Sequence, residues 1–271
     1  MFSRGLWRIG TNGPFISAQN ATSITMHLLK RAVRKAKLTL LQAILPESRH
    51  GTLTFAQCGE DIIVSYVFSL RGISKPTYID IGAHHPFRLS NTALFYQRGS
   101  RGVNIEPNPE QFSSFLKYRS QDINLNVGIG GSESTQTFYC LEDAPLSTFS
   151  AAEAAAFQRH GHKLKAELQL QVLPIGKIIT DHCNGRFPDF MNLDVEGFET
   201  EILSSVDFIN DYPKVICIET ANYSPTGNGP KRHELMSFLE KKNYFLYADT
   251  NLNSIYVHRV FWTSAIATES P

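Results

Sequence analysis

The stretch that decides the fold is Tyr78-Ile79-Asp80-Ile81-Gly82-Ala83-His84-His85. A short apolar run leads into an acidic residue, a glycine and a turn, and a helical pattern follows over residues 91–98. In an open α/β sheet, such a turn lies at the carboxyl edge, where ligands bind. Gly82 lets the backbone approach a ligand closely, because glycine has no side chain. The stretch therefore predicts a βαβ unit with a cofactor site at its first turn.

The chain from Thr52 onward continues this alternation of apolar strand patterns and helical patterns. Strands are predicted at residues 77–81, 102–105, 123–127, 136–139, 168–173, 190–193, 215–218, 244–247 and 254–257. Helices are predicted at residues 60–70, 91–98, 109–118, 151–165, 199–204 and 231–242. The alternation predicts an α/β fold with a mostly parallel sheet. The last two strands predict an antiparallel hairpin at the sheet edge.

A second carboxylate supports a cofactor site at the same edge. Glu106 ends the second predicted strand, 24 residues after Gly82. This is close to the spacing of the acidic residue that binds the ribose hydroxyls in nucleotide-binding α/β folds. Because neighbouring parallel strands end in one crevice, Asp80, Gly82 and Glu106 are predicted to share a site.

The missing glycines indicate which cofactor is bound. A dinucleotide site has G-x-G-x-x-G after the first strand, whereas Gly82 is followed by Ala83-His84-His85-Pro86-Phe87. The chain also has no G-x-x-x-x-G-K-[ST] phosphate loop. An acidic residue and one glycine without a phosphate cradle suit S-adenosylmethionine, an adenosine cofactor that has no phosphate. A nicotinamide-dependent oxidoreductase is the alternative, since it shares the expected role of Glu106 but needs the missing glycines.

The composition indicates a globular protein. The chain has 271 residues, of which 42% are hydrophobic and 19% charged, enough to build a sizeable core. No apolar run reaches the roughly 18 residues of a membrane-spanning helix, and the N-terminus shows no secretory signal. The four cysteines form no C-x-x-C pair, so neither a zinc site nor a disulfide framework is expected. We therefore predict a reducing, cytoplasmic location.

Charge is distributed unevenly along the chain. Residues 1–50 carry a net charge of +7 and the remainder carries −6. The acidic body has no charge-based reason to bind nucleic acid, so no nucleic-acid partner is predicted. Residues 23–45 repeat apolar residues every three to four positions and contain five Lys or Arg residues, which predicts a basic amphipathic helix. Such a helix is compatible with peripheral membrane contact, with a second subunit, or with packing on its own domain.

Several separated motifs match one enzyme family in the right order. They are Phe55-Ala-Gln-Cys-Gly-Glu60-Asp61, Tyr78-Ile-Asp-Ile-Gly-Ala-His84, Ser90-Asn91-Thr92, Gly102-Val-Asn-Ile-Glu106-Pro-Asn108-Pro, Asn126-Val-Gly128, Phe190-Met-Asn-Leu-Asp194-Val-Glu196-Gly197-Phe-Glu199 and Val215-Ile-Cys-Ile-Glu219. On these residues the chain resembles the FkbM-type S-adenosylmethionine-dependent methyltransferases, over about residues 52–260.

The resemblance implies a class I methyltransferase fold, which is Rossmann-like, with seven strands in the order 3-2-1-4-5-7-6 and the last strand antiparallel. We therefore expect a basic N-terminal helical extension over residues 1–50, a methyltransferase domain over residues 51–262 and a flexible tail over residues 263–271. The implied reaction is O-methylation of a hydroxyl on a sugar, glycan or secondary metabolite.

The resemblance also assigns cofactor-binding residues. Asp80, Gly82 and Ala83 are expected to line the methionine end of S-adenosylmethionine, and Glu106 to bind its ribose. Asn126 and Val127 are expected to border the adenine. The flanking residues His84 and Pro107 belong to the same expected site.

A further acidic segment, Asn192-Leu193-Asp194-Val195-Glu196-Gly197, follows the strand predicted at residues 190–193. Its carboxylates are predicted to emerge at the same edge as Asp80. Methyl transfer to a hydroxyl requires that donor and acceptor be juxtaposed and that the hydroxyl proton be removed. Asp194 is the first candidate for this catalytic role and Glu196 the second. His85, with its neighbour His84, is the rival base, since imidazole titrates near neutral pH.

Two questions stay open at the level of sequence. Oxygen-rich residues around Asp194 are compatible with a divalent metal ion, but no compact ligand spacing supports one. A non-catalytic interaction protein that keeps the cofactor fold is a further alternative to the methyltransferase and the oxidoreductase. A small-molecule or glycan acceptor is expected if the chain is the methyltransferase, and an insertion over residues 141–165 could cover that acceptor.

Overall fold

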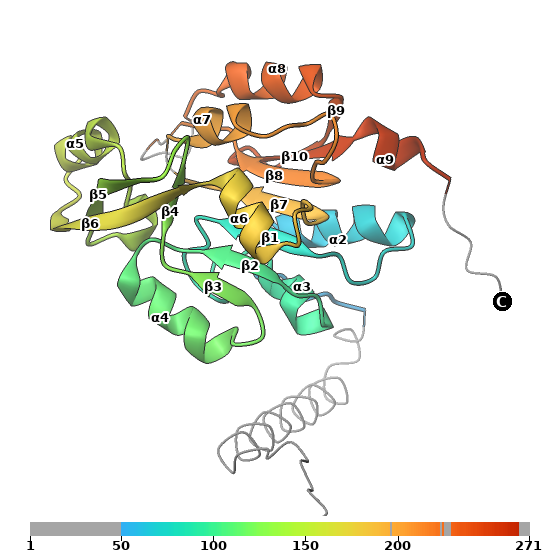
Figure 1. The fold of residues 1–271 in the computed structure, drawn as a ribbon, viewed down its shortest axis with the longest axis horizontal. Helices are drawn as coiled ribbons and strands as arrows, with labels where there is room; N and C mark the ends of the chain where they lie inside the picture. Colours follow the sequence, from blue (N-terminus) through green and yellow to red (C-terminus); the bar gives the residue numbers. More distant parts are fainter. Residues whose placement is uncertain (1–49, 196, 223, 225–228, 266–271) are drawn as a thin grey trace, which may run out of the picture. The chain divides into compact units, whose positions relative to one another are not determined.

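The computed structural model describes residues 50–195, 197–222, 224 and 229–265. A seven-stranded sheet forms the centre of this part of the chain, in the order β3-β2-β1-β7-β8-β10-β9 (Figure 1). Its strands are β1 (Tyr78–Ile81), β2 (Gly102–Ile105), β3 (Ile123–Leu125), β7 (Phe190–Leu193), β8 (Val215–Glu219), β9 (Tyr244–Asp249) and β10 (Asn253–His258).

The strand pairing confirms the class I methyltransferase sheet. β1 pairs in parallel with β2 on one side and β7 on the other, and β7 pairs in parallel with β8. β10 runs against its neighbours, because it pairs antiparallel with both β8 and β9. Numbered within this sheet alone, the order is 3-2-1-4-5-7-6 with the last strand reversed, as the resemblance implies.

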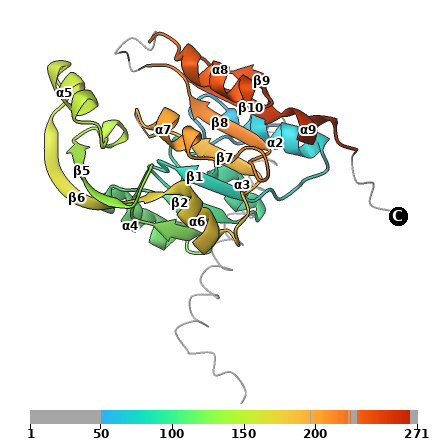
Figure 2. The ribbon, with the colours of Figure 1, turned by 45° about the horizontal axis from the view of Figure 1, so that its top comes forward.

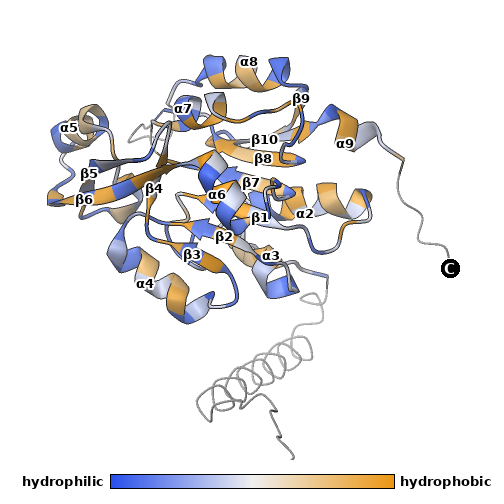
Figure 3. Cartoon of the chain, in the orientation of Figure 1, coloured by the Kyte–Doolittle hydropathy of each residue, from blue (hydrophilic) through white to orange (hydrophobic). Residues whose placement is uncertain are grey.

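Helices cover both faces of the sheet, and side chains that alternate along the strands separate two cores. Ile79 and Ile81 of β1 pack in a core with α6 (Ile175–His182), α7 (Glu199–Ser204) and α8 (His233–Lys241). Tyr78 points to the other face, toward α2 (Glu60–Leu70) and α3 (Ala93–Arg98). Strands with apolar residues on both faces are typical of a sheet buried between helices. Figure 3 shows these apolar strands between helices that each have a polar side.

A second, smaller sheet is built from strands that follow β3 in the chain. It has the order β4-β6-β5 and consists of β4 (Gly128–Gly130), β5 (Ser134–Leu141) and β6 (Leu164–Pro174). β5 and β6 pair antiparallel, which confirms the extra strand predicted at residues 136–139. The connection between them contains the short 3-10 turn η2 (Ala144–Leu146) and α5 (Ala151–Arg159), which project to one side of the main sheet (Figure 2).

Apart from the short elements β4 and η2, which were not predicted, three elements differ from the sequence predictions. The helix predicted over residues 151–165 ends at Arg159, because Gly161 adopts a left-handed conformation with φ 95° and Leu164 already belongs to β6. Helix α6 is absent from the predicted elements, although its apolar residues recur at helical spacing at Ile175, Ile178 and Ile179. A short helix, α9 (Arg259–Thr263), follows β10 where the sequence predicts only a strand end.

The remaining helix, α4 (Pro109–Tyr118), follows β2 and is capped by Asn108, whose side chain accepts a hydrogen bond from the Glu110 amide. The chain divides into two compact units, Met1–Thr52 and Leu53–Pro271, and the second holds every helix and strand that the structure describes. The amphipathic helix predicted at residues 23–45 lies outside the described residues. Among residues 50–265, as far as they are described, no helix has the length and apolar character required to cross a bilayer.

Candidate active site

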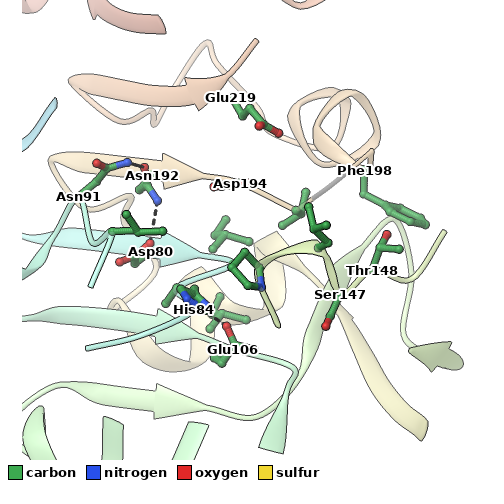
Figure 4. A pocket seen from close by; sticks show the side chains of 18 of the residues that line it. Asp80, His84, Asn91, Glu106, Ser147, Thr148, Asn192, Asp194, Phe198 and Glu219 are labelled. Carbon is green, nitrogen blue, oxygen red and sulfur yellow. Dashed lines mark hydrogen bonds between the residues drawn. The ribbon is translucent and has the colours of Figure 1, made fainter. Parts of the chain in front are cut away.

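A cavity of about 450 Å³ lies at the carboxyl edge of the main sheet. Residues that follow β1, β2, β7 and β8 line it, and the connection between β5 and β6 contributes part of the wall. Figure 4 shows Asp80, Asn91 and Asn192 at one end of the cavity and Ser147, Thr148 and Phe198 at the other. Most of the predicted cofactor residues line this cavity: Asp80, Gly82, Ala83, His84, Glu106, Pro107 and Val127.

Gly82 allows the turns after β1 and β7 to pack directly against each other. Its φ is +78°, and a Cβ placed on it would lie 1.6 Å from the carbonyl oxygen of Asp194. The Asp194 amide in turn donates a hydrogen bond to the carbonyl of Ile81. No side chain fits at this position, so glycine here brings the predicted cofactor turn beside the predicted catalytic turn.

Glu106 is held with its carboxylate at the cavity wall. The amide of His84 donates to its Oε2 at 2.7 Å, and the amide of Asn108 donates to its Oε1 at 2.7 Å. The residue is only 5% exposed, yet it lines the cavity. Each carboxylate oxygen keeps a further lone pair after these two bonds. The two oxygens together therefore suit a pair of neighbouring hydroxyl donors.

Burial dominates the electrostatics of this turn. Burial raises the pKa of Glu106 to about 8, and the nearby charges of Asp80 and Asp194 raise it further. The two amide hydrogen bonds act in the opposite direction, because they favour the anion. Burial also lowers the pKa of His84 to about 4, and the neighbouring His85 and Arg88 lower it further. His84 is therefore neutral at physiological pH and a weaker base than an ordinary histidine.

Each carboxylate oxygen of Asp80 accepts one hydrogen bond from a protein side chain. The hydroxyl of Thr92 donates to its Oδ2 and the amide of Asn192 donates to its Oδ1 at 2.8 Å. Thr92 also accepts a hydrogen bond from the buried guanidinium of Arg119 at 2.8 Å. Burial raises the pKa of Asp80, while Arg119 and these hydrogen bonds act in the opposite direction. Asp80 thus fixes the end of β1 relative to β7 and α3.

Asn126 lies beside the cavity rather than in its lining. Its side-chain amide donates to the main-chain carbonyls of Glu106 and Pro107, both at 2.8 Å. The predicted adenine-side pair is therefore split: Val127 lines the cavity, whereas Asn126 ties the loop after β2 to the loop after β3.

Asp194 follows β7 and lines the cavity together with Glu106. Its carboxylate has no hydrogen-bond partner among the described residues. Desolvation raises the pKa of Asp194 to about 7, and the neighbouring charges of Glu199 and Asp80 add to the effect, whereas Arg232 opposes it. A carboxylate with such a pKa is suited to accept a proton near neutral pH.

The other two predicted catalytic residues have different outcomes. Glu196 lies outside the described residues. His85 is not brought together with Asp194, because its Nδ1 accepts hydrogen bonds from the amides of Phe87 and Arg88, at 3.1 and 3.0 Å, and it does not line the cavity. These bonds use the lone pair that a base would need, so His85 shapes the turn after β1.

Sequence reasoning left several cavity residues without a role. Gln57 and Cys58 belong to the first quoted family motif, and Asn91 belongs to the third. The two carboxylates of the first motif explain its pattern: Glu60 accepts hydrogen bonds from Cys58, Thr250 and Asn253, and Asp61 accepts from Thr54 and Phe55. The hydrogen bonds to Glu60 and Asp61 hold the segment of residues 54–59, from which Gln57 and Cys58 line the cavity. Phe138, Phe149, Phe198 and Glu219 also line the cavity. Phe198 and Glu219 belong to quoted family motifs, whereas Phe138 and Phe149 lie in none of them.

No set of three His, Cys, Asp or Glu side chains within the described part of the chain is arranged to hold a metal ion. The donor set instead fits an adenosine-type cofactor. A fixed carboxylate faces the cavity at the end of β2, and the apolar residues Val127 and Ile129 also line the cavity. The cavity volume of about 450 Å³ is also in the range of small-molecule and cofactor sites.

Several solved methyltransferase structures are similar to this chain in part. The 1,6-didemethyltoxoflavin-N1-methyltransferase of Burkholderia thailandensis, solved with 1,6-didemethyltoxoflavin and S-adenosylhomocysteine, is 8% identical, with 91% of each chain covered and a TM-score of 0.37. The precorrin-6y C5,15-methyltransferase of Geobacter metallireducens is 13% identical, with 72% of this chain and 87% of that chain covered and a TM-score of 0.38. The TehB-like methyltransferase of Corynebacterium glutamicum is 9% identical, with coverages of 87% and 100% and a TM-score of 0.39.

These likenesses are too distant to assign a substrate to this chain. No curated protein matches the sequence. The family assignment comes from a family model described as the methyltransferase FkbM domain, which matches residues 80–246. The matched region runs from Asp80 at the end of β1 into β9, and thus includes Glu106, Asp194 and most of the cavity. The chain therefore belongs to the FkbM family of S-adenosylmethionine-dependent methyltransferases, and the nicotinamide-dependent and non-catalytic alternatives are set aside.

Proposed function

We propose that this enzyme transfers the methyl group of S-adenosylmethionine to a hydroxyl of a sugar, glycan or secondary metabolite. One observation carries the proposal. Asp194 lines the same cavity as Glu106, and its carboxylate has no hydrogen-bond partner among the described residues. A hydroxyl acceptor needs a group that orients it and accepts its proton, and Asp194 supplies both functions.

The cofactor's methionine end is assigned to Asp80, Gly82, Ala83 and His84, and its ribose to Glu106. Pro107 and Val127 are assigned to the adenine end, and Asn126 supports it by holding the loop after β2. When bound, the cofactor supplies an electrophilic methyl group on a positively charged sulfur. The acidic residues around the cavity favour that positive charge, since opposite charges attract strongly in a poorly solvated site.

Asp194 is proposed to act on the acceptor rather than on the cofactor. Its raised pKa makes it a better base than an exposed aspartate, whose pKa near 4 leaves little affinity for a hydroxyl proton. The carboxylate would orient the acceptor hydroxyl and take its proton as the oxygen–methyl bond forms and the methyl–sulfur bond of the cofactor breaks, which releases S-adenosylhomocysteine. Glu196 is retained as a second candidate from the sequence alone.

The far end of the cavity has the character of a sugar-type site. Phe149 lies with its ring centroid 4.8 Å from that of Phe138 and 6.5 Å from that of Phe198, so the three rings form a continuous aromatic wall. Glu219 lines the same cavity from the end of β8. An aromatic wall and a carboxylate suit an acceptor with both C–H surface and hydroxyl groups. An amine acceptor is the competing outcome of the test.

The test is the chemical identity of the product. The enzyme is incubated with S-adenosylmethionine carrying a ¹³C-labelled methyl group and with a panel of sugar glycosides, phenols and amines. The NMR shift of the labelled carbon distinguishes a methyl ether from an N-methyl group. We expect a methyl ether from at least one hydroxyl acceptor. Transfer to amines alone would contradict the proposal.

A further inference from the structure

A chain of polar contacts ties the Asp194 turn to the end of β8. Glu199, the first residue of α7, is fully buried, and its carboxylate accepts hydrogen bonds from the amides of Val195 and Gly197, both at 3.2 Å. Arg232 donates from Nη1 to Glu199 at 2.6 Å. The other terminal nitrogen of Arg232 donates to the carbonyl of Glu219 at 2.8 Å and lies 3.6 Å from its carboxylate.

These contacts converge on the turn that carries Asp194, yet Glu199 and Arg232 are absent from the cavity lining. They cannot touch the acceptor unless the site rearranges. Their effect must pass through the residues that they hold, which are the backbone around Asp194 and the end of β8 with Glu219. Both of those carboxylates line the cavity.

We propose that Glu199 and Arg232 are positioning residues, which fix the Asp194 turn at the end of β7 and set the charge that Asp194 experiences. The inference rests on the proposed function, in which Asp194 is the acceptor base. Glu199 fixes the turn by accepting hydrogen bonds from two of its main-chain amides. Arg232 pairs with the charge of Glu199 and does not line the cavity.

The charged groups around Asp194 show why Glu199 and Arg232 affect its protonation. The groups whose charges act on it come from every neighbouring element: Asp80 of β1, Glu60 of α2, Glu106 after β2, Glu199 of α7 and Arg232 before α8. Glu219 of β8 also lies within reach of Arg232. Arg232 is the one basic group in this set, and Glu199 is the acidic group with the largest effect on the pKa of Asp194.

Removing the negative charge of Glu199 and removing the positive charge of Arg232 should therefore shift the titration of Asp194 in opposite directions. Glu199→Gln removes a negative charge and leaves Arg232 to favour the Asp194 anion, so the Asp194 titration moves to lower pH. Arg232→Gln removes the positive charge, so the titration moves to higher pH. We expect each displacement to be about one pH unit, the size produced by a charge a few ångströms away in a protein site. A role in folding alone would not reverse direction between the two variants.

The experiment follows Asp194 directly by NMR of the full-length protein labelled with ¹³C at the aspartate side-chain carboxyls. The Asp194 signal is identified by its loss in Asp194→Asn. Its titration is measured in wild type, Glu199→Gln, Arg232→Gln and Arg232→Lys, and the last should stay near wild type because it keeps the charge. Lys231→Gln is the matched control, since Lys231 contacts Thr220 and Asp249 instead of the Asp194 turn. Binding of S-adenosylhomocysteine, measured by calorimetry, should be unchanged in the variants at positions 199, 231 and 232.

The proposal is overturned if the Asp194 titration stays in place in Glu199→Gln, or if both charge-removing variants move it in the same direction. Should Arg232→Gln fail to fold, Glu199→Gln and Arg232→Lys still decide the matter, because the first must move the titration down and the second must not. This readout is independent of turnover. A variant Asp194→Asn with normal turnover would defeat the proposed function, whereas an Asp194 titration indifferent to Glu199 defeats only the positioning roles.

Discussion

At the scale of single residues, Gly82 is the position where backbone geometry and the site depend on each other most directly. Gly82→Ala places a methyl group against the carbonyl of Asp194, in a left-handed conformation. We expect a larger loss of unfolding free energy than in Gly161→Ala, which has φ +95° but open space around it. The control should cost about 1–2 kcal/mol from conformation alone. Urea denaturation measures both, and equal losses would show that the contact with Asp194 is not tight.

Glu106 makes a prediction about pH. With a pKa of about 8 in the free protein, its carboxyl is protonated at pH 6, whereas the ribose hydroxyls are best bound by the anion. Binding must then release a proton, so affinity for S-adenosylhomocysteine rises with pH up to about 8 and levels off above it. The slope should approach tenfold per pH unit below pH 7. Calorimetry between pH 6 and 9 measures it.

The control for this prediction is Glu106→Gln, which keeps the shape of the side chain but has no proton to lose. Its affinity should be lower by about 1.5–3 kcal/mol at pH 9, the value of hydrogen bonds to a charged group. It should also lose most of the pH dependence. A wild-type affinity that is flat between pH 6 and 9 would remove Glu106 from the ribose site.

The residue predictions that reached the cavity came from strand ends. Asp80, Glu106 and Asp194 each follow a short apolar run, and parallel pairing brings such ends to one edge whatever the side-chain details. His85 was predicted as an imidazole base on the cofactor turn and Asn126 from the family resemblance, but the side chains of both form hydrogen bonds with main-chain groups. The pKa values of Asp194 and His84 were equally out of reach, because they depend on burial by residues far apart in the chain.

At the scale of elements, a buried network centred on Arg119 joins β1, the start of α3 and the loop before β3. Arg119 follows α4, is fully buried and pairs with Asp122, while its other nitrogens donate to Thr92 and Tyr78. Arg119→Leu leaves Asp122 buried without its cation, so we expect it to lose about 3–5 kcal/mol of unfolding free energy. Chemical denaturation gives the value.

An exposed arginine provides the comparison for Arg119. Arg159 ends α5 and lies at the surface, and Arg159→Leu should change stability by less than about 0.5 kcal/mol. If Arg119→Leu behaved like Arg159→Leu, the network would contribute little, and Asp80 would be held mainly by Asn192.

The elements of the main sheet are predictable because each strand is an apolar run bounded by turn residues. The connection between β5 and β6 is less predictable from the sequence. Its alanine-rich start, residues 151–156, predicts a helix, but periodicity does not reveal that β6 begins at Leu164 and pairs with β5. Residues 144–149 of this connection line the cavity. The aromatic wall of Phe138, Phe149 and Phe198 comes from three separate segments of the chain, so no local sequence pattern predicts it.

At the scale of the whole molecule, the cavity and every described helix and strand belong to the unit that begins at Leu53. We therefore expect that deleting residues 1–45 leaves a folded protein that binds S-adenosylhomocysteine as tightly as the full chain. Circular dichroism and calorimetry check this. In that case the basic segment at residues 23–45 serves to locate the protein in the cell or to contact a membrane or a second subunit. Loss of soluble folded protein on truncation would instead show that this segment packs on the domain.

The central claim is that Asp194 is the group that orients and deprotonates a hydroxyl acceptor beside the cofactor. The most direct measurement is the initial rate of methyl-ether formation by Asp194→Asn relative to wild type, with saturating S-adenosylmethionine and affinity for S-adenosylhomocysteine measured in parallel. The substitution keeps the shape of the side chain and removes its charge. We predict a rate lower by about 10²-fold or more, the span of general-base effects, with cofactor affinity unchanged. A rate equal to wild type, or a parallel loss of cofactor binding, would contradict this role for Asp194.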